Sequence, residues 1–262
     1  MKRTILIASM LAWLSACKYE PSNPPQSWPQ PHRAPGFSLL GLTIDAGPDT
    51  IAGEMISWSF VSDNLACHEV SISDYESTAT FYNPSSYVVP AGDAQLNGVS
   101  LPPRGNWYQS YNSPSFGMAH HWHIASNLSG SVPAIDDSVP SPRLIHVTYP
   151  RHATDTISRT RGFNCTYENP GTDSITVRIY YDSVVTRMFD KSIHHPTSAP
   201  VQTTAENTGS YFVDPSVLTS FPNSGVIQVW VIAYRSKKLV VSGRSYMIAS
   251  VSSARTYCFI KS

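Results

Sequence analysis

The chain has 262 residues, of which 18 are Lys or Arg and 18 are Asp or Glu, so its formal net charge is zero. Because no basic excess exists to neutralise phosphates, nucleic-acid binding is not expected. Hydrophobic residues make up 41% and charged residues 14% of the chain, which is enough apolar material for folded cores and too little charge for a disordered protein.

The N-terminus has the pattern of an export signal. Two basic residues, Lys2 and Arg3, precede an apolar stretch over 4–14. About ten apolar residues are too few to cross a ~30 Å hydrocarbon core as a permanent helix. This length, with these flanking residues, is typical of a secretory signal peptide, so we expect residues 1–16 to be removed.

The segment 14–17, Leu-Ser-Ala-Cys, resembles the lipobox of bacterial lipoproteins. The resemblance implies that Cys17 is acylated and becomes the mature N-terminus, which would attach the protein to a membrane through lipid chains. Lys18 stands where an inner-membrane retention signal would have Asp, so the outer membrane is favoured. The resemblance leaves open whether the protein faces the periplasm or the cell surface.

Residues 17–36 form a predicted tether behind the lipid. Six prolines occur between residues 18 and 36. Proline blocks helices and sheet ladders and favours the extended polyproline conformation. We therefore expect a lipidated, Pro-rich tether that holds the folded part away from the bilayer.

Alternation of apolar and polar residues dominates the chain from residue 37 onward. Ile56, Trp58 and Phe60 alternate with serines, and the segment 175–181 alternates in the same way. This period of two predicts half-buried strands. The segment 225–234 is apolar on both faces, as a central strand would be. No window after the signal peptide predicts a helix of ten or more residues, so the predicted fold class is all-β.

A boundary is expected where prolines and small polar residues replace the alternation, over 131–142. We therefore predict two β-sandwich domains, over 37–135 and 143–262. The segments 91–98, 161–167 and 208–218 resemble motifs of uncharacterised two-domain bacterial extracellular proteins. The resemblance, with the strand spacing, implies an immunoglobulin-like or fibronectin-type sandwich for the second domain and assigns no activity.

Enzyme motifs are incomplete in this sequence. His68 and Glu69 begin like a zinc-protease motif, but no second histidine follows at the required spacing. Gly243 begins a segment like the nucleophile elbow of hydrolases, but Met247 replaces its second glycine. We therefore expect no catalytic activity and no cofactor.

Two histidines are the strongest candidates for a metal site. On a strand, His121 and His123 would project from the same face. A metal ion would need further ligands, for which His68, Glu69 or His146 would have to approach through folding. The alternative is a polar strand face with Trp122 buried behind it. We adopt this alternative and predict no metal site.

Aromatic side chains suggest a ligand-binding segment over 106–112. Trp107, Tyr108 and Tyr111 lie among Asn and Gln residues in this segment. Exposed aromatic rings stack on the C–H faces of sugars while amides bond to sugar hydroxyls. These three residues are therefore candidate ligand contacts. The alternative is that Trp107 fills the first core or the seam between the domains.

Three cysteines remain once Cys17 is acylated: Cys67, Cys165 and Cys258. An oxidising envelope permits a disulfide. Cys165 and Cys258 are the expected pair because both belong to the second domain, and the alternative is that all three thiols are small buried hydrophobes.

These features predict a non-catalytic lipoprotein of the cell envelope. Loops on a rigid scaffold are the usual place for recognition, so the leading hypothesis is binding or adhesion to a protein or glycan partner. The alternative is a structural spacer or assembly component of an envelope complex, without a small ligand.

Overall fold

The computed structural model confirms the all-β fold class. It describes residues 37–39, 42–44, 51–64, 69–83, 85, 87–127, 129, 131–151, 155–192 and 194–262. The predicted signal peptide, the tether, Cys17, Cys67 and His68 lie outside these residues. Within the described ranges, no helix is long and apolar enough to cross a membrane.

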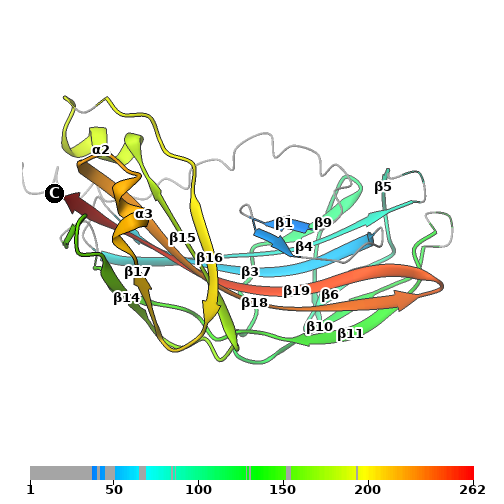
Figure 1. The fold of residues 1–262 in the computed structure, drawn as a ribbon. Helices are drawn as coiled ribbons and strands as arrows, with labels where there is room; N and C mark the ends of the chain where they lie inside the picture. Colours follow the sequence, from blue (N-terminus) through cyan, green and yellow to red (C-terminus); the bar gives the residue numbers. More distant parts are fainter. Residues whose placement is uncertain are drawn as a thin grey trace, which may run out of the picture.

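One sheet of ten strands runs through the molecule, and we call it the long sheet (Figure 1). Its path is β16-β15-β18-β19-β3-β4-β9-β8, with β13 paired to β19 and β5 paired to β4. The strands are β16 (Val201–Glu206), β15 (Ser174–Tyr181), β18 (Ser224–Val241), β19 (Arg244–Lys261), β3 (Ile51–Asn64), β4 (Glu69–Tyr82), β9 (Trp107–Ser110), β8 (Pro103–Arg104), β13 (Thr156–Ser158) and β5 (Val88–Val89).

Two smaller sheets pack on the long sheet. The order in the four-stranded sheet is β11-β10-β6-β7 and in the three-stranded sheet β12-β14-β17. In Figure 1 both lie below the long sheet, with β14 and β17 at the left and β10 and β11 at the right. Their strands are β11 (Ile135–Pro140), β10 (Ala119–Ile124), β6 (Ala94–Leu96), β7 (Val99–Ser100), β12 (Val147–Tyr149), β14 (Phe163–Tyr167) and β17 (Ser210–Val213).

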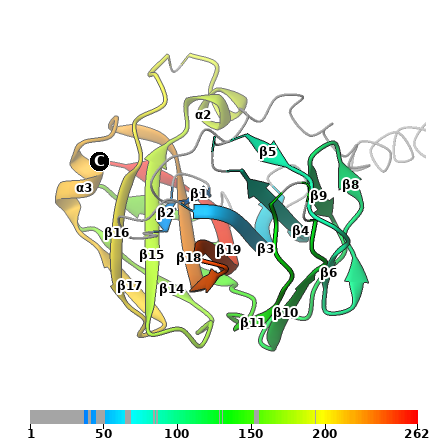
Figure 2. The same ribbon diagram turned by 90° about the vertical axis from the view of Figure 1, so that its right-hand side faces the viewer.

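Short elements complete the fold. β1 (Phe37–Leu39) and β2 (Leu42–Ile44) form a separate hairpin, which lies on the opposite side of the long sheet from the two smaller sheets (Figure 1 and Figure 2). Within the residues that the structure describes, the helices are α2 (Ser183–Phe189) and α3 (Pro215–Thr219), each capped by an aspartate, Asp182 and Asp214. Neither reaches ten residues, as the sequence indicated.

The hairpin of β18 and β19 is the longest pair of strands in the long sheet and lies near its centre. Each strand has 18 residues, and they pair along their whole length. Ser242 and Gly243 connect them with φ angles of 52° and 74°. Two positive φ angles are what the common two-residue hairpin turn requires, because its twist then matches that of the strands.

The two largest apolar cores lie on the same face of the long sheet, and three smaller buried clusters, around Trp230, Met247 and Val226, lie on its opposite face. The four-stranded sheet covers the first core and the three-stranded sheet covers the second. Leu239, Tyr246 and Ile248 belong to the first core although they fall within the predicted second domain. The reason is that the long hairpin of β18 and β19 supplies strand surface to both cores. The first core is built around Met55, Phe81 and Trp122, and the second around Ile145, Tyr181 and Leu218.

A buried polar row separates the two cores. On the core face of the long sheet, Ser57 pairs with Ser250 and Ser59 with Ser252 in the parallel register of β3 and β19. All four serines are fully buried. Buried hydroxyls are costly without hydrogen bonds, so this row needs polar partners from the covering sheets.

Candidate functional site

A hollow of about 210 Å³ opens beside the first core, and we call it the serine pocket. Its wall combines three aliphatic residues and Pro114 with hydroxyl and amide side chains, and it carries no charged side chain. The polar lining residues are Ser77, Asn97, Ser110, Asn112, Ser113 and Ser115.

Strand register brings the deepest of these serines together. Ser77 on β4 pairs with Ser110 on β9, and on its other side Ser77 pairs with Ser57 on β3. Ser77 is only 1% exposed, and its Oγ has no hydrogen-bond partner within the described part of the chain. Ser110 Oγ accepts a hydrogen bond from the backbone N–H of Asn112, with 3.2 Å between the atoms. The pocket therefore contains an unsatisfied buried hydroxyl.

A buried histidine lies behind this group of serines. His120 Nδ1 is 2.5 Å from Ser57 Oγ and 3.1 Å from Ser250 Oγ. The ring of Phe116 meets the imidazole edge to face, with 5.0 Å between the ring centroids. Burial lowers the pKa of His120 to about 4, because an apolar environment disfavours the charged imidazolium. His120 is therefore neutral at physiological pH.

Two of the three aromatic candidates, Trp107 and Tyr108, lie on opposite faces of β9, and Tyr111 directly follows this strand. Tyr108 is a buried residue of the first core, and its hydroxyl donates a hydrogen bond to the backbone oxygen of Ala91 at 2.9 Å. Trp107 is half-buried and Tyr111 is 54% exposed. None of the three lines the serine pocket. The neighbouring Ser110 and Asn112 line it instead.

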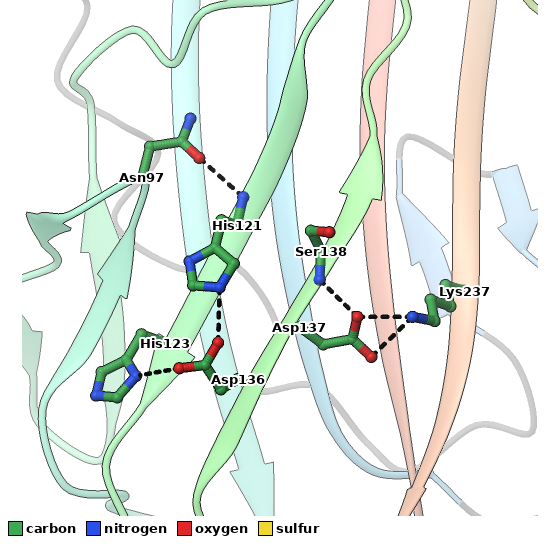
Figure 3. Close-up of polar contacts among 7 residues, drawn as sticks. All are labelled: Asn97, His121, His123, Asp136, Asp137, Ser138 and Lys237. Atoms are coloured by element: carbon green, nitrogen blue, oxygen red, sulfur yellow. Dashed lines mark hydrogen bonds and ion pairs between the residues drawn. The ribbon is translucent and has the colours of Figure 1, made fainter.

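Strand β10 places its histidines as its alternation predicts. Residues His121 and His123 point outward, while Trp122 is fully buried behind them. Both imidazoles bind the carboxylate of Asp136 on β11, which is the register partner of His123 (Figure 3). His121 Nε2 is 2.6 Å from Oδ1 and His123 Nδ1 is 3.0 Å from Oδ2. Hydrogen bonds to His123 and His121 lower the pKa of the Asp136 carboxyl.

The cluster of His121, His123 and Asp136 consists of two separate histidine–aspartate contacts on the protein surface. The side chains of His121, His123 and Asp136 are 51%, 47% and 63% exposed. One nitrogen of each imidazole directly contacts a carboxylate oxygen of Asp136. Across the ranges that the structure covers, no group of three or more His, Cys, Asp or Glu side chains is arranged to hold a metal ion. Of the further ligands considered, His68 and the side chain of Glu69 lie outside the described structure.

A second ion pair beside this cluster ties β11 to the long hairpin. Lys237 Nζ lies 2.6 Å and 2.8 Å from the two oxygens of Asp137 (Figure 3). This hydrogen bond from Lys237 is the main cause of the lowered pKa of the Asp137 carboxyl. The pair joins residues 100 positions apart, and so fixes the end of the hairpin against the four-stranded sheet.

The disulfide expected between Cys165 and Cys258 is not formed. Both thiols are free and fully buried in the second core. Burial raises the pKa of Cys165 to about 12 and also raises the pKa of Cys258. They therefore behave as small hydrophobic side chains, which was the alternative reading of the sequence.

Sequence reasoning missed the residues that make the serine pocket. Ser77 and Ser110 line the pocket and His120 lies behind them. All three are buried strand residues, and a buried serine or histidine has no distinctive sequence pattern. The signal that could have found two of them is the two-residue spacing from a large buried aromatic residue, because residues two positions apart on a strand share one face. Ser110 is two residues from Tyr108 on β9, and His120 is two residues from Trp122 on β10.

Two comparisons with known proteins were negative. No protein-family model matches the chain, and no curated protein sequence matches it either.

Proposed function

We propose that the protein is a non-catalytic lipoprotein of the bacterial outer membrane that binds a saccharide in the serine pocket. The signal-peptide pattern and the lipobox at Cys17 support the location. The fold supports the binding role, because the long sheet holds the pocket on a rigid frame while loop residues 112–115 form part of its wall.

The observation that carries the proposal is the buried, unpartnered Oγ of Ser77 in an uncharged pocket. Leaving such a hydroxyl without a partner costs about 1–3 kcal/mol. Sugar hydroxyls both donate and accept hydrogen bonds, so they match a lining of serine and asparagine side chains. The hollow of about 210 Å³ has room for roughly seven waters at ~30 Å³ each, a space on the scale of one sugar ring.

The buried Ser57 and His120 do not support hydrolysis. Nucleophilic serine chemistry needs a base that a third group orients. No carboxylate among the described residues hydrogen-bonds to His120, and Ser57 is fully buried. We therefore assign the pair to the polar row between the cores.

A glycan array probed with the purified full chain tests the proposal. Ser77→Ala should weaken saccharide binding about tenfold, which corresponds to one lost hydrogen bond of ~1.4 kcal/mol. Ser59→Ala is the matched control, because Ser59 Oγ is also buried and unpartnered but does not line the pocket. Binding that survives Ser77→Ala unchanged contradicts the proposal.

The structural spacer is the second candidate function, and one observation favours it. β18 and β19 cross both cores as single 18-residue strands, so the two halves form one stiff body. A spacer would bind no saccharide on the array, and the same experiment therefore separates the two functions.

A further inference from the structure

The serine pocket has two chemically different walls. The long sheet supplies a hydroxyl wall, with Ser77 on β4 and Ser110 on β9. The other wall comes from the hairpin of β6 and β7 and the residue that follows it, and its aliphatic members are Leu96, Val99 and Leu101. Both leucines are buried members of the first core, so this wall continues the apolar interior. A ligand in the pocket must therefore suit a polar wall and an apolar wall at once.

An asparagine at the turn of this hairpin adds a hydrogen-bond donor. Asn97 follows β6 with a φ angle of 51° and lines the hollow. Its Oδ1 accepts a hydrogen bond from the backbone N–H of His121 at 2.8 Å (Figure 3). Because this bond turns Oδ1 toward β10, a ligand would meet the amide at Nδ2, which is a donor only. Asn97 therefore suits a ligand that offers an acceptor such as a carbonyl oxygen.

A plain hexose does not match both walls. A sugar hydroxyl placed against Leu96 or Leu101 would leave water without gaining a hydrogen bond in return, which is costly. A methyl group in the same place would instead remove apolar surface from water. Among the described residues, no charged side chain lines the hollow, so its lining offers no ion pair to a charged sugar. The walls favour an uncharged sugar that carries both a methyl group and an acceptor.

We propose that the serine pocket is selective for N-acetylated amino sugars. The acetamido carbonyl oxygen would accept a hydrogen bond from Asn97 Nδ2, and the acetyl methyl group would lie against Val99 and the two leucines. The ring hydroxyls keep the Oγ of Ser77 as their partner, which is buried and unsatisfied within the described part of the chain. The inference rests on the proposed function of the pocket and adds the class of saccharide that it takes.

Calorimetric titration of the full chain with N-acetylglucosamine and N-acetylgalactosamine tests the inference. Glucose and galactose are the matched hexoses without the acetamido group, and free acetamide is the matched compound without the ring. We expect one of the two acetamido sugars to bind about tenfold or more tightly than its parent hexose, and acetamide to show no binding at equal concentration. The N-formyl analogue of that sugar, which lacks only the methyl group, should bind about fourfold more weakly than the N-acetyl form.

Two variants test the assigned contacts. Asn97→Asp keeps an oxygen for the His121 N–H and tolerates the positive φ, but it removes the Nδ2 donor and should weaken binding of the acetamido sugar about tenfold. Val99→Thr replaces a methyl group by a hydroxyl and should reduce the preference for N-acetyl over N-formyl. The matched controls are Asn164→Asp and Val240→Thr, which change exposed strand residues outside the pocket and should leave binding unchanged. The urea midpoint of each variant reports whether it is folded.

Each other outcome overturns the inference. Equal affinity for the acetamido sugars and their parent hexoses removes the selectivity but leaves saccharide binding intact. Equal binding of acetamide reduces the site to a general amide site, and full binding by folded Asn97→Asp removes the assigned contact. If neither acetamido sugar binds, the inference fails, and the glycan array decides separately on the proposed function. Another saccharide bound there through Ser77 preserves that function, whereas no bound saccharide removes both.

Discussion

Ser57 Oγ lies 2.5 Å from His120 Nδ1, although the two residues are 63 positions apart and belong to different sheets. Ser57 comes from the polar row of the long sheet and His120 from the covering sheet. Their contact is one of the few polar links through an otherwise apolar interior, and it lies directly beside the pocket residue Ser77. This link gives the fold a pH dependence.

Acid should destabilise the protein through His120. Its pKa is about 4 in the native state against a reference value of 6.5, so between these pH values the unfolded chain binds more protons. The contribution of His120 to stability is therefore complete above pH 6.5 and is lost as the pH drops toward 4, by on the order of 3 kcal/mol. Urea unfolding of the wild type and of a His120 variant at pH 7.5 and 4.5 isolates this loss from the opposite contribution of Glu54. His120→Gln should reduce the loss, whereas His194→Gln, an exposed histidine, should not.

Glu54 should act in the opposite direction. Burial raises the pKa of its carboxyl to about 7 from 4.5, and the Tyr82 hydroxyl donates to Oε1 at 3.3 Å. The native state therefore binds more protons between pH 4.5 and 7, and stability declines as the pH rises through this window, by on the order of 3 kcal/mol. Glu54→Gln should flatten this decline in unfolding titrations. The exposed Glu206→Gln variant is the control and should keep the wild-type dependence of stability on pH. If Glu54→Gln also keeps this dependence, Glu54 is not its cause.

Gly225 should tolerate no side chain. Its φ is 131°, and an added Cβ would lie 2.6 Å from Cε2 of the fully buried Tyr181. Overpacking of this kind costs about 1–3 kcal/mol, and the backbone strain adds to it. The control is Gly243→Ala, where φ is also positive but nothing lies within 4 Å of the added carbon. Gly225→Ala should lower the urea midpoint more than Gly243→Ala; equal effects would contradict the tight packing against Tyr181.

Cys165 and Cys258 should react with alkylating reagents only after unfolding. Both thiols are buried and free, and their raised pKa values leave little thiolate at pH 8. Peptide mapping after alkylation, with and without urea, measures this protection. A crosslinked peptide containing both cysteines in the unreduced protein would contradict the structure.

Replacing Cys17 by alanine should abolish lipidation. The lipobox resemblance implies that this thiol is the acylation site, and cleavage of the signal peptide follows acylation in the family that the segment resembles. Metabolic labelling with a fatty acid should mark the wild-type chain and leave Cys17→Ala unlabelled. Equal labelling of both chains would exclude Cys17 as the lipid site.

The local features of the fold follow from the sequence. Alternation predicts the strands, and the apolar segment 225–234 predicts a central strand, which β18 confirms by pairing with both β15 and β19. The outward direction of His121 and His123 follows from the same period of two. These successes share one cause, because side-chain direction along a strand is a local property.

Contacts between distant strands could not be predicted in this way. Parallel pairing of β19 with β3 joins residues almost 200 positions apart, for example Ser250 and Ser57. Nothing in either segment specifies this partner, since many strands share the same alternation. The serine pocket depends on that pairing and on the register of Ser77 with Ser110, so it becomes visible only in the folded chain.

A crystal structure of the full chain with a saccharide selected on the glycan array tests the central claim most directly. The account predicts a sugar ring in the serine pocket with a ring hydroxyl within hydrogen-bond distance of Ser77 Oγ. A sugar stacked on Trp107 or Tyr111, with only water beside Ser77, would contradict it.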